Sequence, residues 1–220
     1  MRPRVLIADD HQLFAESLRS LLCPSHDVVG IATNGRELTE LAEQFKPDLV
    51  VTDLTMPLLN GLDAMQNLKG RRLRSKFIVL TMHVDVSLAV LVFRAGASAF
   101  VLKTASGDEL KEALQIVQRG GYYLSPQFPC DLVTVLAEAA RRPVSDRAPQ
   151  LTRRQREVLQ LVAEGKTMKE VASQLNISTR TAESYKYHLM EVLAIHTTAE
   201  LVQYAIKIGL ITIQQLDVAV

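Results

Sequence analysis

The sequence contains no tryptophan and only two cysteines, Cys23 and Cys130, among its 220 residues. Two cysteines are too few for the disulfide framework that stabilises small secreted domains. They also lie outside the spacings that cysteine-ligated metal sites use. We therefore interpret both as buried free thiols and expect neither a disulfide nor a metal site from them.

Long apolar runs are absent from the sequence as well, although 48% of its residues are hydrophobic. No run approaches the roughly 20 residues that a membrane-spanning helix needs. The first ten residues, MRPRVLIADD, reach acidic residues after a few apolar ones, whereas a secretory signal peptide carries a longer apolar core. The sequence predicts a protein that makes no membrane contact and resides in the cytoplasm.

The chain also has little net charge, +1, from 25 Lys and Arg against 24 Asp and Glu. This balance argues against a strongly basic protein that wraps nucleic acid, but it allows a local basic patch. With 22% charged residues, the composition is that of a globular protein. The length suffices for one large domain or two ordinary ones.

From residue 4 to about residue 120, short β-rich runs alternate with helical periodicity. The predicted strands are RVLIA (4–8), DVVGIAT (27–33), DLVVT (48–52), FIVLT (77–81) and AFVLK (99–103). Between them, apolar residues recur at helical spacing, as in Phe14, Leu18, Leu21 and Leu22, in Leu38, Leu41, Ala42 and Phe45, and in Leu88, Leu91 and Val92. This alternation predicts an α/β domain, a flavodoxin-like doubly wound (βα)5 sheet with strand order 2-1-3-4-5 and helices on both faces.

A last helix of this first domain has its own start and stop signals. Ser106 and Glu109 have the spacing of an N-terminal capping box, and Gly120 and Gly121 stand where the helix should end. We therefore place the first domain at residues 1–125.

The remaining residues divide into a linker and a helical domain. Four prolines bracket the segment CDLVTVLAEAARR, so we predict that residues 126–148 form a linker that contains one helix. In residues 149–220, three threonines are followed three positions later by Gln or Glu, as in capping boxes: Thr152 with Gln155, Thr167 with Glu170, and Thr197 with Glu200. Gly165 and Gly209 stand where helices should end. The second domain is predicted to be a small all-α bundle.

Polar side chains end four of the five predicted strands. Asp9 and Asp10 end the first strand, Asp53 the third, Thr81 the fourth and Lys103 the fifth. In the order 2-1-3-4-5, the first and third strands are neighbours at the switch point, where doubly wound sheets bind ligands. All five side chains should therefore meet at one edge of the sheet.

Three neighbouring carboxylates raise one another's pKa values unless a cation lies among them, and hard oxygen ligands suit Mg²⁺. A lysine ammonium and a threonine hydroxyl are apt partners for phosphoryl oxygens. Taken singly, an Asp pair is usually a turn or cap, and a Thr or Lys at a strand end is usually structural or solvated. Their convergence favours a site in which Asp53 acts as a nucleophile and forms an aspartyl-phosphate.

The segments ADD (8–10), DLTMPLLNGL (53–62), LTMH (80–83) and FVLK (100–103) resemble the receiver domain of two-component response regulators over the first 120 or so residues. The resemblance implies that Asp53 accepts a phosphoryl group from a sensor histidine kinase. It implies that Asp10, Asp53 and the main-chain carbonyl of Thr55 bind Mg²⁺, with Asp9 helping through water. Such a protein is a signalling regulator rather than an enzyme, and it catalyses only its own Mg²⁺-dependent aspartyl phosphorylation and dephosphorylation.

The same resemblance implies a pair of switch residues, Thr81 and Phe100, whose hydroxyl moves toward the phosphate and whose ring turns inward. A simple core aromatic is an equal alternative for Phe100. Thr55 and His83 would flank the phosphate and tune dephosphorylation, although a solvent-facing His83 with no role is the simpler interpretation.

The stretch from Leu151 to Leu193 has the helix, turn and helix spacing of a DNA reader, with the turn at residues 175–178 and Ser178 as the cap of the next helix. The predicted buried stripe of that helix is Ala182, Tyr185, Leu189 and Leu193, and its predicted outward residues are Glu183, Ser184, Tyr187, His188 and Glu191. The segment resembles the LuxR-type helix-turn-helix of the NarL/FixJ class. The resemblance implies that the helix from Thr179 enters the major groove of double-stranded promoter DNA, and that a later helix with Ala199, Val202 and Ile206 pairs with its copy in a homodimer on two half-sites.

The helical domain departs from its relatives in charge. Residues 149–220 hold eight Lys or Arg against seven Asp or Glu, so the attraction to DNA phosphates should be modest. Arg180 and Lys186 are the first candidates for backbone contacts. Many members of the family that this segment resembles carry a lysine at the position of Glu183. The Glu183 carboxylate would either accept a hydrogen bond from a cytosine amino group or remain a solvated charge on the helix.

Two other function classes stay open from the residues alone. A haloacid-dehalogenase-like phosphohydrolase also forms an aspartyl-phosphate after a strand, but it requires a second acid two residues later, where this chain has Thr55. A protein-interaction switch whose helical domain no longer binds DNA is compatible with the low positive charge.

Overall fold

The computed structural model describes residues 2–71, 73–82, 84–128, 132, 151–208 and 210–211. The chain divides into two compact units, residues 1–144 and 145–220. Of the predicted linker, only residues 126–128 and 132 belong to the described part, and the helix predicted within it lies outside that part. The domain limits 1–125, 126–148 and 149–220 therefore stay predictions.

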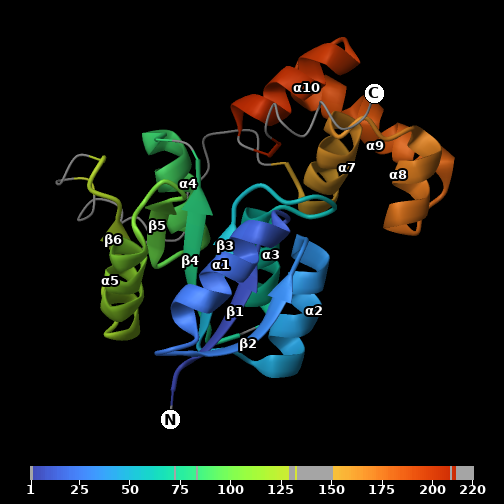
Figure 1. Cartoon of the computed structure of the whole chain (residues 1–220). Coiled ribbons are helices and arrows are strands. Elements are labelled where there is room, and N and C mark those ends of the chain that lie inside the picture. The colour runs from blue at the N-terminus through green and yellow to red at the C-terminus, as the bar shows by residue number, and fades with distance from the viewer. Residues whose placement is uncertain are drawn as a thin grey trace. The chain divides into compact units, whose positions relative to one another are not determined.

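The first unit contains a six-stranded parallel sheet (Figure 1). Its strands are β1 (Arg4–Ala8), β2 (Asp27–Ala32), β3 (Leu49–Asp53), β4 (Lys76–Thr81), β5 (Ala99–Leu102) and β6 (Tyr123–Leu124). The order β2-β1-β3-β4-β5-β6 confirms the order predicted for the first five strands. β6 is not predicted by the sequence, because a strand of two residues carries no periodicity. They are held by pairing, Tyr123 with Ala99 and Leu124 with Phe100.

Five helices cover the two faces of this sheet: α1 (Gln12–Leu22), α2 (Gly35–Phe45), α3 (Gly61–Gly70), α4 (Val86–Ala95) and α5 (Gly107–Gln118). Successive strand residues point to opposite faces. Val5 and Ile7 of β1 pack with α1 and α5, whereas Leu6 and Ala8 pack with α2, α3 and α4. The predicted doubly wound architecture is confirmed, and the inner strands β1, β3, β4 and β5 are mostly apolar because they are buried on both faces.

Three local expectations for this unit need correction. Leu91 is 38% exposed, because Leu88, Ala89 and Val92 form the buried side of α4. Cys23 is exposed rather than buried, since it is the C-terminal cap of α1 and lies past the buried face of that helix; Cys130 lies outside the described residues.

The third correction concerns the start of α5, where only one of the two hydrogen bonds of the predicted capping box is present. The Ser106 hydroxyl accepts a hydrogen bond from the Glu109 amide at 3.2 Å, as predicted. The Glu109 carboxylate, however, accepts a hydrogen bond from Ser125 Oγ at 2.5 Å, and Ser125 Oγ in turn accepts one from the Leu102 amide. The glutamate therefore connects α5 to the segment after β6 instead of closing the box.

The second unit is a bundle of four helices among the described residues: α7 (Arg153–Ala163), α8 (Met168–Leu175), α9 (Thr179–Val192) and α10 (Thr198–Lys207). All three predicted capping boxes are present, at Thr152, Thr167 and Thr197. Gly165 has φ 79° just after α7, a backbone conformation that favours glycine; Gly209 lies outside the described residues. None of the described helices has the length and apolarity that crossing a membrane requires.

Candidate functional site

The strand ends of the first unit bring the predicted polar residues to one edge of the sheet. Asp9 follows β1, Asp53 is the last residue of β3, and Thr81 is the last residue of β4. The register pairs Ala8 with Thr52, so the ends of β1 and β3 are level. Lys103 follows β5, and its amide donates a hydrogen bond to the Thr81 carbonyl at 2.7 Å. The structure thus gathers side chains that lie more than ninety positions apart in the chain, from Asp9 to Lys103.

Lys103 connects two of the carboxylates. Its Nζ lies 2.7 Å from Asp53 Oδ2, to which it donates a hydrogen bond, and 2.7 Å from Asp9 Oδ2. The ammonium also lies 5.0 Å from the centroid of the Phe14 ring. Only 9% of the Lys103 side chain is exposed, so its charge acts on its partners with little screening by solvent.

Four neighbouring residues could together hold a cation: Asp9, Asp10, His11 and Asp53 each offer a donor atom, and these atoms lie within 4.8 Å of one another. Two of the carboxylate oxygens, Asp9 Oδ2 and Asp10 Oδ1, are buried and accept no well-directed hydrogen bond, although Lys103 Nζ and His11 Nδ1 lie 2.7 and 3.0 Å from them. A metal ion stabilises buried carboxylate oxygens that accept no well-directed hydrogen bond. The residues present therefore fit the predicted cation site.

Burial raises the pKa of the Asp53 carboxyl from 3.8 to about 6. The Lys103 charge acts in the opposite direction, and the nearby Asp9 and Asp10 carboxylates add to the increase. Burial by itself would lower the pKa of Lys103, but Asp53 and Asp9 hold it above its ordinary value. One lysine therefore compensates the acidic cluster only in part, and a bound divalent cation would supply the rest.

The pKa of Asp53 predicts how stability responds to pH when no divalent cation is present. A carboxyl whose pKa is higher in the folded than in the unfolded state binds protons preferentially in the folded state, so the free energy of unfolding should fall as pH rises from about 4 to about 6. Asp53→Asn removes this dependence and should stabilise the fold by about 3 kcal/mol at pH 7. Urea unfolding at pH 5 and pH 7, with a chelator present, measures both effects. Saturating Mg²⁺ should reverse the order of the two proteins at pH 7, and a variant that is less stable than the wild type in chelator would contradict the assigned pKa.

The segment after β3 holds Asp53 in place. The Leu54 amide donates a hydrogen bond to the Leu80 carbonyl, and the Gly61 amide donates one to the Leu54 carbonyl. A Cβ atom on Gly61 would lie 2.0 Å from the carbonyl oxygen of Asp53, so only glycine fits there. The Thr55 amide lies 3.4 Å from Asp53 Oδ1, at the long limit of a hydrogen bond.

The two predicted switch residues are both buried. Thr81 is 2% exposed and Phe100 is fully buried. The Phe100 ring packs edge-on against Phe128, with 5.6 Å between ring centroids, and so contacts the beginning of the predicted linker. The ring lies inside in this structure. His83 lies outside the described residues.

In the second unit, α8 and α9 are joined by a short turn in which Asn176 adopts a left-handed conformation, φ 52°. Ser178 Oγ accepts a hydrogen bond from the Thr181 amide and caps α9. Ala182 and Leu189 are buried, with Tyr185 and Leu193 half-buried. The predicted inward face of this helix is therefore confirmed.

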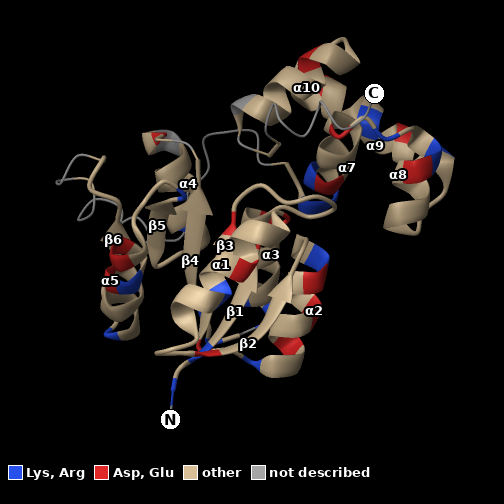
Figure 2. Cartoon of the chain, viewed as in Figure 1, with Lys and Arg blue, Asp and Glu red and all other residues tan. Residues whose placement is uncertain are grey.

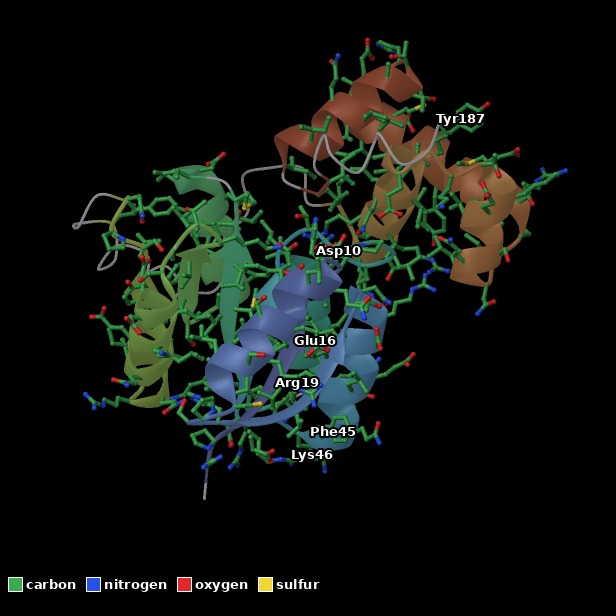
Figure 3. All side chains as sticks on the ribbon, in the orientation of Figure 1. Asp10, Glu16, Arg19, Phe45, Lys46 and Tyr187 are labelled. Atoms are coloured by element: carbon green, nitrogen blue, oxygen red, sulfur yellow. The ribbon has the colours of Figure 1, made fainter. Side chains whose placement is uncertain are left out.

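The opposite face of α9 is open to solvent. Its exposed residues include the predicted DNA contacts Arg180, Glu183, Ser184, Tyr187 and His188. Tyr187 is 73% exposed and its side chain extends away from the helix (Figure 3). Lys186 is half-buried, and its Nζ donates a hydrogen bond to Thr198 Oγ1 at 2.8 Å, a contact that the sequence did not predict.

Figure 2 shows charges of both signs on α7 and α8, and on α7 both Arg153 and Arg154 form ion pairs with Glu157. On α10, Ala199 is exposed, whereas Val202 and Ile206 are half-buried and pack against the core of the bundle. Two of the three predicted dimer contacts thus also serve the fold of a single chain.

Comparisons with known proteins agree with this arrangement. Residues 5–115 match the family described as "Response regulator receiver domain", and residues 149–205 match "Bacterial regulatory proteins, luxR family". Transcriptional regulatory protein DegU of Brevibacillus brevis is 31% identical over 226 aligned positions, which cover 96% of each chain. The RcsB response regulator of Salmonella typhimurium is 27% identical, with a TM-score of 0.63 over 94% of this chain and 98% of its own. A structure of an RcsB–DNA complex matches with a TM-score of 0.52 and 27% identity, over 94% of this chain and all of its own.

Proposed function

The chain belongs to the two-component response regulators, with a receiver domain followed by a LuxR-type DNA-binding domain, and we propose that phosphorylation of Asp53 controls its binding to promoter DNA. The observation that carries the proposal is Lys103, whose Nζ lies 2.7 Å from both Asp9 Oδ2 and Asp53 Oδ2. That position is where the oxygens of a phosphoryl group on Asp53 would need a positive partner. The donor is a sensor histidine kinase, and the protein works in the cytoplasm.

In the transfer step, a carboxylate oxygen of Asp53 attacks the phosphorus of a phosphohistidine. The phosphorus–nitrogen bond breaks as the phosphorus–oxygen bond forms, and its electron pair leaves with the imidazole. Asp10, Asp53 and the Thr55 carbonyl would hold Mg²⁺, with Asp9 helping through water, and the bound metal would supply positive charge to the phosphoryl group. Lys103 exchanges its contact with Asp53 for one with a phosphoryl oxygen.

Thr81 and Phe100 pass the change to the rest of the protein. The Thr81 hydroxyl moves toward the phosphate, which shifts β4. Because Val79 of β4 pairs with Phe100 of β5, that shift also moves the Phe100 ring. That ring contacts Phe128, at the beginning of the linker. The packing supplies a route from the acidic site to the linker.

The second domain reads DNA with α9 in the major groove and pairs with its copy on two half-sites. Arg180 and Lys186 contact phosphates, while Ser184, Tyr187, His188 and, through its carboxylate, Glu183 meet base edges. Ala199, Val202 and Ile206 of α10 form the dimer contact. The exposure of this side of α9, with Tyr187 73% exposed, supports the assignment, because these side chains are free to reach base edges.

Alanine at Ser184 or Tyr187 tests this reading of α9. Each substitution should weaken binding to a specific site by about 1–3 kcal/mol and leave binding to random DNA nearly unchanged, because base-edge contacts carry specificity and phosphate contacts do not. Both side chains are exposed, so the fold should tolerate the changes. The measurement is a gel shift on a site footprinted in the protein's own promoter region, with Gln203→Ala on the exposed side of α10 as the matched control.

Equal losses on specific and random DNA would place Ser184 and Tyr187 on phosphates. A wild-type protein that shows no salt-dependent binding to any promoter DNA would instead support the alternative of a protein-interaction switch.

A further inference from the structure

Ser125 is a buried serine whose side chain bonds to the end of β5. In Figure 1, β6 lies beside β5 at the edge of the sheet. β6 ends at Leu124, and Pro126, which has no amide hydrogen, cannot extend its pairing. The Ser125 carbonyl, which a longer strand would offer to β5, accepts a hydrogen bond from the Phe128 amide in the following turn. Ser125 Oγ takes its place and accepts a hydrogen bond from the Leu102 amide at 3.1 Å.

The Ser125 hydroxyl is held from a second side by Glu109, in the first turn of α5. The hydroxyl donates a hydrogen bond to Glu109 Oε1 at 2.5 Å, so a lone pair of the same oxygen stays directed toward the Leu102 amide. Ser125 is only 1% exposed, so solvent cannot replace a lost partner. Without the hydroxyl, the Leu102 amide would lose its acceptor on this side of β5.

Leu102 directly precedes Lys103, so its position decides where the lysine side chain begins. The Leu102 carbonyl accepts a hydrogen bond from the Ala105 amide at 3.0 Å, and the Lys103 amide donates one to the Thr81 carbonyl at 2.7 Å. The contact with Ser125 is a further hydrogen bond on this short piece of backbone, and it comes from a residue beyond α5. Ser125 therefore helps to fix the point from which the Lys103 side chain extends.

We propose that Ser125 is a positioning residue for Lys103, so that phosphorylation of Asp53 depends on a contact made directly before the predicted linker. The inference rests on the proposed function, in which Lys103 exchanges its contact with Asp53 for one with a phosphoryl oxygen. Lys103 Nζ lies 2.7 Å from Asp53 Oδ2, and a misplacement of about 1 Å in such a group can cost roughly 100-fold in rate. Ser125 acts through the backbone of Leu102 rather than on the reacting atoms.

The first measurement is the rate at which acetyl phosphate and Mg²⁺ phosphorylate Asp53 in the full-length protein. Ser125→Ala should slow this reaction about tenfold, because loss of one backbone contact should displace Lys103 only slightly. Its Mg²⁺ affinity should stay within about twofold of the wild type, because the oxygen ligands remain.

Ser75→Ala is the matched control. Ser75 is also buried, and its hydroxyl donates a hydrogen bond to the Pro47 carbonyl at 2.5 Å. Ser75 directly precedes β4, however, so it lies at the opposite edge of the sheet from Lys103, which follows β5. The substitution should lower the stability of the fold and leave the rate of phosphorylation unchanged.

A double-mutant cycle separates positioning from a general loss of stability. If Ser125 acts through Lys103, Ser125→Ala should have almost no further effect on the rate in the Lys103→Ala protein. A general defect would instead slow both backgrounds by the same factor, and that result would reject the proposal. A wild-type rate in Ser125→Ala alone would reject it as well.

Glu109 supplies a second pair of variants, which decides the question should Ser125→Ala fail to fold. Glu109→Ala removes the acceptor that directs the Ser125 hydroxyl, whereas Glu109→Gln keeps a side-chain oxygen in that place. Glu109→Ala should therefore slow phosphorylation more than Glu109→Gln does. Equal rates in the two variants would contradict the proposal.

Hydrogen exchange of the Lys103 amide tests the positioning without phosphorylation. This amide should exchange about tenfold faster in Ser125→Ala than in the wild type, and at the wild-type rate in Ser75→Ala. A wild type that gains no phosphate on Asp53 would overturn the proposed function, whereas the exchange rates decide separately whether Ser125 holds Lys103 in place. An exchange rate that Ser125→Ala leaves unchanged would reject the positioning role.

Discussion

Asp53→Asn should abolish phosphorylation of this protein by acetyl phosphate and Mg²⁺, whereas the wild type gains a single acid-labile phosphate. The side-chain amide of the new asparagine is neither a nucleophile nor an anionic metal ligand. Within the described cluster, Asp53 is the carboxylate that lies at the end of β3, next to the turn at Gly61. The measurement is intact-protein mass with and without acid treatment. A phosphate that persists in the variant would mean that another nucleophile had been overlooked.

Lys103→Ala tests whether the binding of the metal and the binding of the phosphate depend on different residues. Lys103 contacts Asp9 and Asp53, so its loss removes the positive partner of the phosphoryl oxygens but none of the oxygen ligands. Mg²⁺ should therefore still bind, while phosphorylation slows. Loss of Mg²⁺ binding in Lys103→Ala would reject the division of roles in which the carboxylates serve the metal and the lysine serves the phosphate.

The architecture and the position of the acidic site could be predicted because both follow from strong, repeated patterns. Apolar strands that alternate with amphipathic helices allow few arrangements, and in a parallel sheet all strands end at the same edge. Asp9, Asp53 and Lys103 therefore meet because Asp53 is the last residue of its strand and the other two directly follow theirs. The three capping boxes in the second domain could also be predicted from the sequence, since the two partners of each box lie three positions apart.

What the sequence did not reveal depends on contacts between distant residues. β6 exists because Tyr123 and Leu124 pair with β5, and Glu109 leaves its capping box because Ser125 approaches it from beyond β6. The contact between Lys186 and Thr198 likewise joins two helices. A periodic pattern records which face of an element is buried, but it does not record which partner a polar side chain will find there.

The side-chain contacts of His11 could not be predicted from the sequence, although the residue stands beside two aspartates. The distances of 3.3 and 3.0 Å from its Nδ1 to Asp9 Oδ1 and Asp10 Oδ1 depend on the side-chain conformations of the folded chain. The hydrogen bond from its amide to Asp9 Oδ1, in contrast, is a local turn contact that spans two residues.

A fragment that begins at residue 149 should bind specific DNA without phosphorylation, at least as tightly as the unphosphorylated whole protein. The fragment should fold alone, because the core of the second unit is built from residues between Leu151 and Ile211. A phosphate on Asp53 cannot touch DNA, so it acts by changing an equilibrium between states of the chain. We expect the unphosphorylated receiver to hinder either the reading face of α9 or the dimer contact on α10.

A coupling free energy of about 1–3 kcal/mol is typical of such switches, so removal of the receiver should tighten binding by about 5- to 150-fold if the hindrance is fully relieved. Fluorescence anisotropy at equal monomer concentration compares the fragment, the whole protein and the phosphorylated whole protein on one labelled site. Phosphorylation should bring the whole protein toward the fragment. If the fragment instead binds more weakly than the unphosphorylated whole protein, the receiver does not inhibit. It would then act positively, most simply by supplying a dimer contact that the half-buried Val202 and Ile206 of α10 cannot provide alone.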